Sequence, residues 1–179
     1  TGGGSSLAAS DLNSLDSKTS GTITTANGLV TLTGTVAALN TAYGSEGLTI
    51  QGDEAITISD TTVDAEALNN LNNYTSGVID ADTLTKLTGT LADVNVAFAA
   101  DAASSATISG LGDQDVELTD TNVLAADINT LNTYTSGTVD ASTVAVMEGT
   151  VSALNTAYDT AGINGLGNEA VTITDTTAQ

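Results

Sequence analysis

The sequence predicts an α/β solenoid, a stack of about six half-units of roughly 28 residues that each hold two strands and a helix. The first supporting observation is a long period of 55 to 60 residues, set by two recurring phrases. Thr-Ser-Gly ends at Gly21, Gly77 and Gly137, and Leu-Thr-Gly-Thr (Met-Glu-Gly-Thr in its last copy) has its glycine at Gly34, Gly89 and Gly149. A chain with such a period buries the apolar face of each unit against its neighbours.

The second observation is a finer period inside the first. An apolar residue followed by asparagine comes near the end of a short Ala-rich run, and successive asparagines are 27, 29, 26, 34 and 26 residues apart. These asparagines are Asn13, Asn40, Asn69, Asn95, Asn129 and Asn155. We therefore expect a Gly/Ser-rich linker or joint over residues 1–6 and one repeat solenoid over residues 7–179. The solenoid comprises three double repeats, of which the first and last are incomplete.

The first helix is expected over residues 7–15, where Ala9, Leu12 and Leu15 fall on one face. Gly21 suits the left-handed conformation that ends many helices. Two short strands should follow over residues 22–24 and 29–33, joined by a turn at Asn27-Gly28.

Thr35 is placed to cap the second helix, whose apolar face includes Val36 and Leu39. The second type of half-unit then begins with a strand over residues 48–50 and a turn over residues 52–54. It continues with an alternating strand over residues 55–59.

The same order of elements recurs along the rest of the chain. Further helical faces are expected at Ala65, Leu68 and Leu71; Leu91, Val94, Ala97 and Phe98; Ala125, Ile128 and Leu131; and Val151, Leu154, Ala157 and Tyr158. The last element is a strand over residues 170–174. Helices of two to three turns are marginal alone in water, so they must pack on the strands. An all-β solenoid, with the Ala-Leu-Asn runs as irregular corners, is the alternative.

Composition narrows the function. The chain carries 22 acidic residues against two lysines, a net charge of −20, which excludes nucleic acid as a partner because phosphates need a cationic surface. The same charge disfavours anionic membranes, and no apolar run is long enough to span a bilayer. We expect a soluble protein that works in salt or among divalent cations.

The recurring asparagines are expected to form a structural ladder. An inward asparagine in a solenoid can bond backbone groups of the adjacent coil that lack partners at the corners. A surface or functional role is the alternative.

Acidic residues also recur and make calcium a possible ligand. The candidate ligands are Asp53, Asp60, Asp113, Asp120, Asn168 and Asp175, which lie in the turns before the second-type strands or just after those strands. Calcium takes six to eight oxygen ligands. Asx turns and helix caps explain the same residues without a metal. The tandem glycine-rich calcium repeat is missing from the sequence, and no other cofactor is expected.

Catalysis has little support. The chain contains no His or Cys, and Lys18 and Lys86 do not recur between copies. A pair of carboxylates for glycoside hydrolysis remains an alternative. The repetition argues against it, because an active site is usually formed at one place in a protein. We therefore expect a protein that is not an enzyme.

Several phrases resemble repeats of giant secreted or cell-surface proteins of cyanobacteria, especially marine ones. These phrases stand at residues 77–84, 87–95, 125–131 and 165–176. The resemblance covers nearly the whole chain and implies a role in a surface layer, adhesion or motility. It brings no catalytic motif.

The function expected is that of a structural protein, extracellular or on a cell surface. The chain opens on an expected helix without a preceding strand and closes on a strand without a helix, so the two ends are complementary. An uncapped solenoid invites another copy, and a heterologous contact of this kind gives filaments or a layer. Neighbouring repeats of a longer chain are the alternative partner. A calcium-dependent adhesive module that binds a glycan or another cell is the alternative function.

Overall fold

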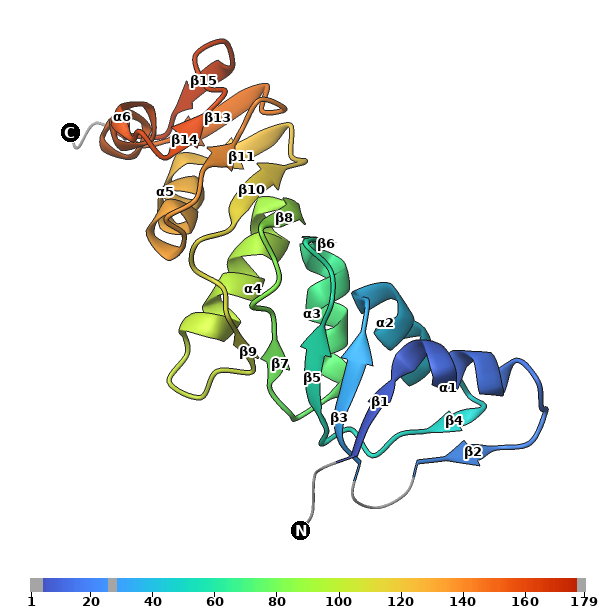
Figure 1. Ribbon diagram of the computed structural model, residues 1–179. Coiled ribbons are helices and arrows are strands. Elements are labelled where there is room, and N and C mark those ends of the chain that lie inside the picture. Colours follow the sequence, from blue (N-terminus) through green and yellow to red (C-terminus); the bar gives the residue numbers. More distant parts are fainter. Residues whose placement is uncertain (1–4, 26–28, 177–179) are drawn as a thin grey trace.

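The chain has an α/β fold with parallel sheets. The computed structural model describes residues 5–25 and 29–176, which form six helices. The helices are α1 (Ala9–Asp16), α2 (Val36–Gly44), α3 (Ala65–Tyr74), α4 (Leu91–Ala102), α5 (Ala125–Tyr134) and α6 (Val151–Asp159). They follow one another along the molecule in sequence order (Figure 1), and each contacts the next. The all-β alternative is wrong, because the Ala-rich runs are helices.

Capping residues fix where several helices begin. The hydroxyl oxygens of Thr35, Thr90 and Thr150 accept hydrogen bonds from the backbone N–H three residues on, at 3.1 to 3.2 Å. The Asp64 carboxylate does the same for α3. Such a cap satisfies one of the free N–H groups at a helix start, so the cap expected at Thr35 is confirmed.

The strands of the described residues form four parallel sheets. The first has the order β1 (Ser5–Ala8), β3 (Leu29–Gly34), β5 (Ala55–Ile58), β7 (Ile79–Asp80), β9 (Ile108–Ser109). The second has the order β6 (Thr62–Asp64), β8 (Lys86–Gly89), β10 (Asp115–Leu118), β12 (Val139–Asp140), β14 (Ile163–Asn164). The third is β11 (Asn122–Leu124), β13 (Val146–Gly149), β15 (Ala170–Ile173), and the fourth is β2 (Ile23–Thr24), β4 (Leu48–Thr49).

The two five-stranded sheets are built in the same way. Each starts with two strands that lead directly toward consecutive helices, continues with one strand of the second-type half-unit, and ends with two short strands that follow later helices. The three-stranded sheet has only the first three of these positions. The two-stranded sheet has only the last two of these positions. Its strand β2 is equivalent to β7 and β12, because all three begin two residues after the glycine of Thr-Ser-Gly.

The first helix does have a strand before it, which corrects one expectation. Ser5 and Ser6 of the expected linker belong to β1, which pairs with β3. Pairing with β3 orders this segment, although Ser5 and Ser6 have little strand propensity. The rest of the expected linker and the turn expected at Asn27-Gly28 lie outside the described residues.

The second-type half-units also contain one more strand than expected. Short strands β6 and β11 lie between the alternating strand and the helix. They carry the same pattern of one buried apolar residue between two exposed ones, Val63 in β6 and Val123 in β11. Three residues are too few to show strand periodicity in a sequence.

The glycine of the Leu-Thr-Gly-Thr phrase lets two half-units approach closely. Gly34 and Gly89 have φ of +152° and +142°, a region that favours glycine. A Cβ at Gly89 would lie 3.4 Å from the Cβ of Ala65, the first residue of the preceding helix, and a Cβ at Gly34 would lie 3.5 Å from that of Ala9. Small residues on both sides therefore keep successive half-units in contact.

The apolar core is one continuous cluster that runs between the helices and the strands. Its largest fully buried side chains include Phe98, Leu39, Ile56 and Leu118. Because each helix supplies a few residues to this cluster and contacts its neighbours, no helix has to be stable alone.

Candidate functional site

The recurring asparagines link consecutive helices. In each helix the fifth residue is the asparagine, and for α1 to α5 its side-chain N–H donates to the backbone carbonyl of the third residue of the next helix. The bonds are Asn13 to Ala38, Asn40 to Ala67, Asn69 to Asp93 and Asn129 to Ala153 at 2.8 to 2.9 Å, and Asn95 to Asp127 at 3.4 Å. Asn155 occupies the same position in α6 and is exposed.

These asparagines lie between helices, not at corners as expected. The accepting carbonyls are inside helices, where the α-helical pattern already gives them a partner four residues on. The side-chain oxygens of the same five asparagines and of Asn72 are buried and accept no hydrogen bond from the described residues. The ladder thus positions helices through one donor per joint, at the cost of a buried acceptor.

Three of the calcium candidates cap helices that lie earlier in the chain. The carboxylates of Asp60, Asp120 and Asp175 accept from the first backbone N–H of α2, α4 and α6, at 2.8, 2.6 and 2.6 Å. A carboxylate is stabilising there, since the N-terminal end of a helix carries partial positive charge. Together with the threonine caps, each of these helices has two of its free N–H groups satisfied.

The other three candidates lie in the turns before the second-type strands. Here the side chain that folds into the turn is the next residue, Glu54, Gln114 or Glu169. The side-chain oxygens of Gln114 and Glu169 accept from the two preceding backbone N–H groups at 2.7 to 3.2 Å. Glu54 and Gln114 are buried. Sequence reasoning missed these residues, although their position in each copy after Gly-Asp or Gly-Asn was a usable signal.

The six calcium candidates are not brought together. Within residues 5–25 and 29–176, no group of three or more His, Cys, Asp or Glu side chains is placed to hold a metal ion. Asp53 is exposed, and Asp113 accepts from the Gln114 amide at 2.8 Å. Calcium binding has no geometric support from these contacts, and it stays a hypothesis.

A second set of contacts joins the Thr-Ser-Gly turns to these glutamate or glutamine turns. Thr75 donates its hydroxyl to the Glu54 carbonyl at 3.0 Å, and Thr135 donates to the Gln114 carbonyl at 2.7 Å. The backbone N–H of the next serine donates to the carbonyl of Gly52 or Gly112, at 2.8 Å in both cases. A Cβ at Gly77 or Gly137 would overlap the same Glu54 or Gln114 carbonyl.

Aromatic side chains near the ends of the helices stack in pairs. Tyr43 lies on Tyr74 with ring centroids 5.7 Å apart, and Phe98 lies on Tyr134 with centroids 6.3 Å apart. Burial, followed by the negative charge of Glu54 beside it, raises the pKa of Tyr43. Burial and the hydrogen bond to Glu169 raise the pKa of Tyr158 to about 12. Both tyrosines are therefore neutral hydrogen-bond donors at pH 7.

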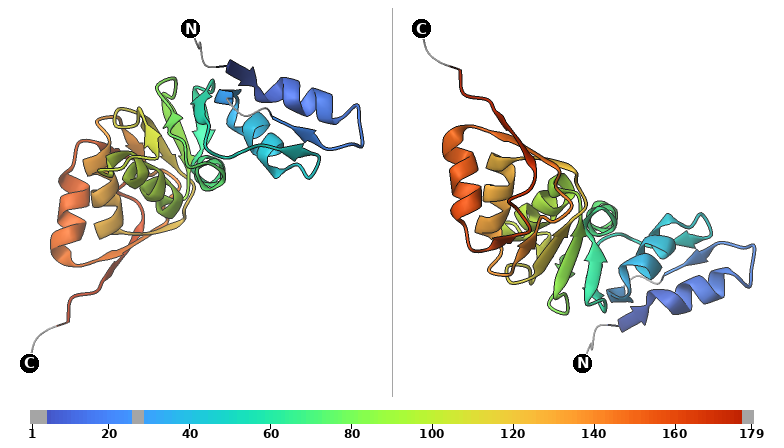
Figure 2. Two further views of the ribbon diagram at one scale, coloured as in Figure 1. Left: turned by 90° about the horizontal axis from the view of Figure 1, so that it is seen from below. Right: turned by 90° about the horizontal axis from the view of Figure 1, so that it is seen from above.

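The two ends of the molecule expose residues that are buried at equivalent interior positions. Leu15 of α1 is 49% exposed, whereas Leu71 and Leu131 at the same place in α3 and α5 are 0% exposed. At the other end, Ile173 of β15 is 59% exposed, against 1% for Ile58 and Leu118. These surfaces lie at opposite ends of the stack of helices (Figures 1 and 2).

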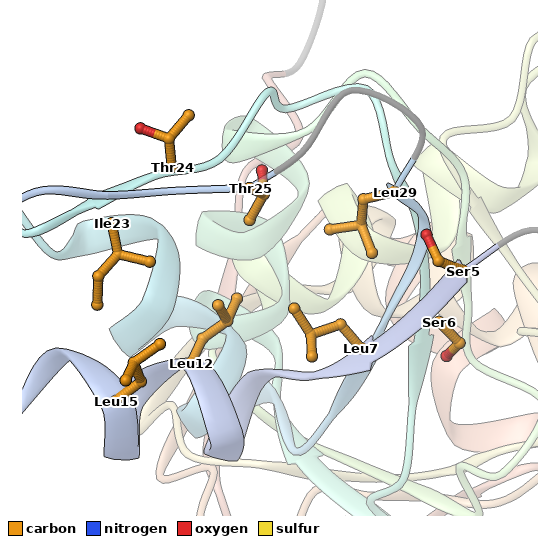
Figure 3. Close-up of a pocket in the computed structure, with 9 residues that line it drawn as sticks. All are labelled: Ser5, Ser6, Leu7, Leu12, Leu15, Ile23, Thr24, Thr25 and Leu29. Carbon is orange, nitrogen blue, oxygen red and sulfur yellow. The ribbon is translucent and has the colours of Figure 1, made fainter.

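The exposed face at the α1 end contains a pocket of about 340 Å³. Its apolar lining consists of Leu7, Leu12, Leu15, Ile23 and Leu29 (Figure 3). None of the described residues that line it has a titratable side chain.

Comparison of the chain with models of protein families, with curated proteins and with solved structures finds no match in any of the three. None of the described helices is both long and apolar enough to cross a membrane.

Proposed function

We propose that this chain is a structural repeat protein, extracellular or on a cell surface, that assembles head to tail into filaments or a surface layer. The six helices and their strands form a solenoid of six half-units in this proposal. The periodic observation that supports this arrangement is the asparagine hydrogen bond. It joins the fifth residue of one helix to the third residue of the next between all five pairs of consecutive helices.

The observation that carries the assembly proposal is the exposure of core positions at both ends. Apolar layers and strand edges that are exposed at the end of a stack of repeats favour addition of another unit. Since the two faces differ, the contact between copies is heterologous and does not close on itself. The resemblance to repeats of large cell-surface proteins supports the location.

Electron microscopy of the purified 179-residue chain tests this proposal, with samples prepared in calcium and in a chelator. Filaments or sheets in both conditions support a structural role. Single particles in both conditions contradict it. Assembly or thermal stabilisation that requires calcium would instead favour the adhesive module.

A further inference from the structure

The interior of the molecule shows twice how one double repeat meets the next. At the joint between α2 and α3 and at the joint between α4 and α5, a Thr-Ser-Gly turn contacts a glutamate or glutamine turn through two hydrogen bonds. One is from the threonine hydroxyl and the other is from the serine N–H, as described above. The strand after each Thr-Ser-Gly turn pairs in parallel with the strand after the other turn.

Both halves of this joint recur at the two ends, where no residue within 5–25 and 29–176 occupies them. Thr19 accepts the backbone N–H of Gly21 at 3.0 Å, as Thr75 and Thr135 do for their glycines at 2.9 Å. Glu169 folds into its turn as Gln114 does, accepting from the N–H of Gly167 at 2.8 Å. The two turns therefore already have the conformation that they have inside the molecule.

The sheets are complementary in the same way. The third sheet, β11-β13-β15, lacks two strands relative to the five-stranded sheets, and the fourth sheet, β2-β4, consists of those two strands. In the interior the register joins Ile56 to Ile79 and Val116 to Val139. The equivalent residues at the free edges are Val171 of β15 and Ile23 of β2. Three strands of one copy and two of the next make one complete sheet.

The side chains agree with this register. Ile173 is equivalent to Ile58 and lies on the strand that would cover the apolar pocket around Leu15 and Ile23. Tyr158 is equivalent to Phe98 and Tyr43, which stack on Tyr134 and Tyr74. The residue that aligns with these two tyrosines at the first helix is Lys18, which follows α1, and its ammonium group can lie over a tyrosine ring.

From these matches we propose that β15 and the turn over residues 167–169 bind β2 and the turn over residues 19–21 of a second copy of this chain. Val171 pairs with the second copy's Ile23 and Thr172 with its Thr24, so that one five-stranded parallel sheet crosses the joint. Asn155 donates to the carbonyl of the second copy's Asp11. The proposal rests on the proposed head-to-tail assembly and specifies its contact surface and register.

Charge sets the conditions for this contact. Each copy carries −20, so copies repel one another at low ionic strength. At 0.15 M salt the repulsion between exposed charges is screened beyond about 8 Å. Association should therefore strengthen as salt rises toward 0.5 M, since the contact itself is made mainly by backbone hydrogen bonds and apolar side chains.

The substitution Gly21→Ala separates this contact from folding. In the chain alone, a Cβ at Gly21 meets only the Thr19 hydroxyl, at 3.4 Å. In the proposed contact it would overlap the Glu169 carbonyl of the neighbouring copy, as a Cβ at Gly77 overlaps that of Glu54. We expect Gly21→Ala to keep the thermal stability of the unassembled chain and to weaken association at least tenfold. Gly44→Ala, whose Cβ would make an ordinary 3.7 Å contact with Tyr74, is the matched control and should assemble normally.

Cysteine pairing measures the register, because the natural chain has no cysteine. Thr172→Cys protein mixed with Thr24→Cys protein should form a disulfide-linked heterodimer under mild oxidation. The interior pair Thr57→Cys/Asp80→Cys, which has the equivalent register within one chain, calibrates the yield. Thr174→Cys mixed with Thr24→Cys is two residues out of register and should give much less product.

The outcomes separate the two proposals. Assembly of the natural chain, its loss in Gly21→Ala and the heterodimer through residues 172 and 24 support the sheet contact. Assembly that persists in Gly21→Ala, or a heterodimer that prefers residue 174, overturns this contact while leaving head-to-tail assembly in place. A natural chain that stays monomeric in 0.15 and 0.5 M salt overturns both.

Discussion

Asparagine is the residue that most clearly sets the spacing of this structure. Its short side chain reaches from the fifth residue of one helix to a carbonyl in the next helix, and it donates a second hydrogen bond to a carbonyl that already has a helical partner. The side-chain oxygen receives nothing in return from the described residues. The residue is therefore used for position, and its contribution to stability should be modest.

Replacement of Asn69 by alanine should lower the free energy of unfolding by about 1 kcal/mol, because one hydrogen bond is lost while the Asp93 carbonyl keeps its helical partner. Asn69→Asp should cost more, since a carboxylate would face that carbonyl without a donor. Urea denaturation checks both changes. Asn155→Ala is the control and should be neutral, because Asn155 is exposed. Equal losses at both positions would contradict the role of the hydrogen bond between helices.

Asp115 gives a prediction for pH. The backbone N–H of Thr138, followed by the Thr138 hydroxyl, holds the pKa of Asp115 below its ordinary value. Its contribution to stability is therefore present above the ordinary carboxyl pKa and is lost as pH falls through the lower, folded-state pKa. Global acidification also relieves repulsion among the 22 acidic residues, so absolute stability alone is ambiguous.

The comparison with Asp115→Asn removes that ambiguity. The natural chain should be more stable than the variant at pH 6, and the difference should shrink toward zero between pH 5 and pH 2, as measured by thermal unfolding. Thr138→Val removes the hydroxyl donor and keeps the backbone donor, so at pH 6 it should destabilise the chain less than Asp115→Asn does. A gap between the natural chain and Asp115→Asn that stays constant down to pH 2 would show that the charge of Asp115 does not contribute.

Among the elements, the Thr-Ser-Gly turns vary less from one repeat to the next than the helices do. A helix tolerates changes in length, from 8 residues in α1 to 12 in α4. Two of the Thr-Ser-Gly turns tolerate little change, because Gly77 and Gly137 lie against the backbone of the preceding turn. At these two positions the contact accounts for the glycine, while the helices vary in length.

Gly77→Ala and Gly137→Ala should each cost about 2–3 kcal/mol, since the new Cβ would displace the backbone of another turn. Gly21→Ala should be neutral or slightly stabilising in the unassembled chain, because the same turn there has no preceding partner and alanine restricts the unfolded state. Chemical denaturation of the three variants tests this. Three equal effects would mean that the glycines serve local conformation and not the contact between turns.

Much of the element order could be predicted from the sequence. Helix positions followed from apolar spacing and from caps such as Thr35, and the strand over residues 55–59 followed from alternation. What could not be predicted was set by pairing between segments far apart in the sequence. β1 contains two serines and is ordered by β3, and the glutamate turns carry side chains whose partners are backbone N–H groups. The calcium candidates looked alike in sequence, but Asp60, Asp120 and Asp175 cap helices that precede them by 24 to 29 residues.

On the scale of the whole molecule, the same joint is used inside the chain and offered at its ends. The order of the helices from α1 to α6 leaves two different faces at opposite ends (Figure 2). Each face exposes apolar residues whose equivalents in the interior repeats are buried. In the proposed assembly, the charge of −20 disfavours contact between the sides of two molecules, which leaves the ends for association.

The most direct test of the assembly is the mass of the natural chain in solution, measured by light scattering from micromolar to millimolar concentration in 0.15 M salt. Head-to-tail assembly predicts a mean mass that rises continuously above the 17.7 kDa of one chain, without a plateau at a dimer, because the contact does not close. A mass that stays at 17.7 kDa across the whole range would contradict the account.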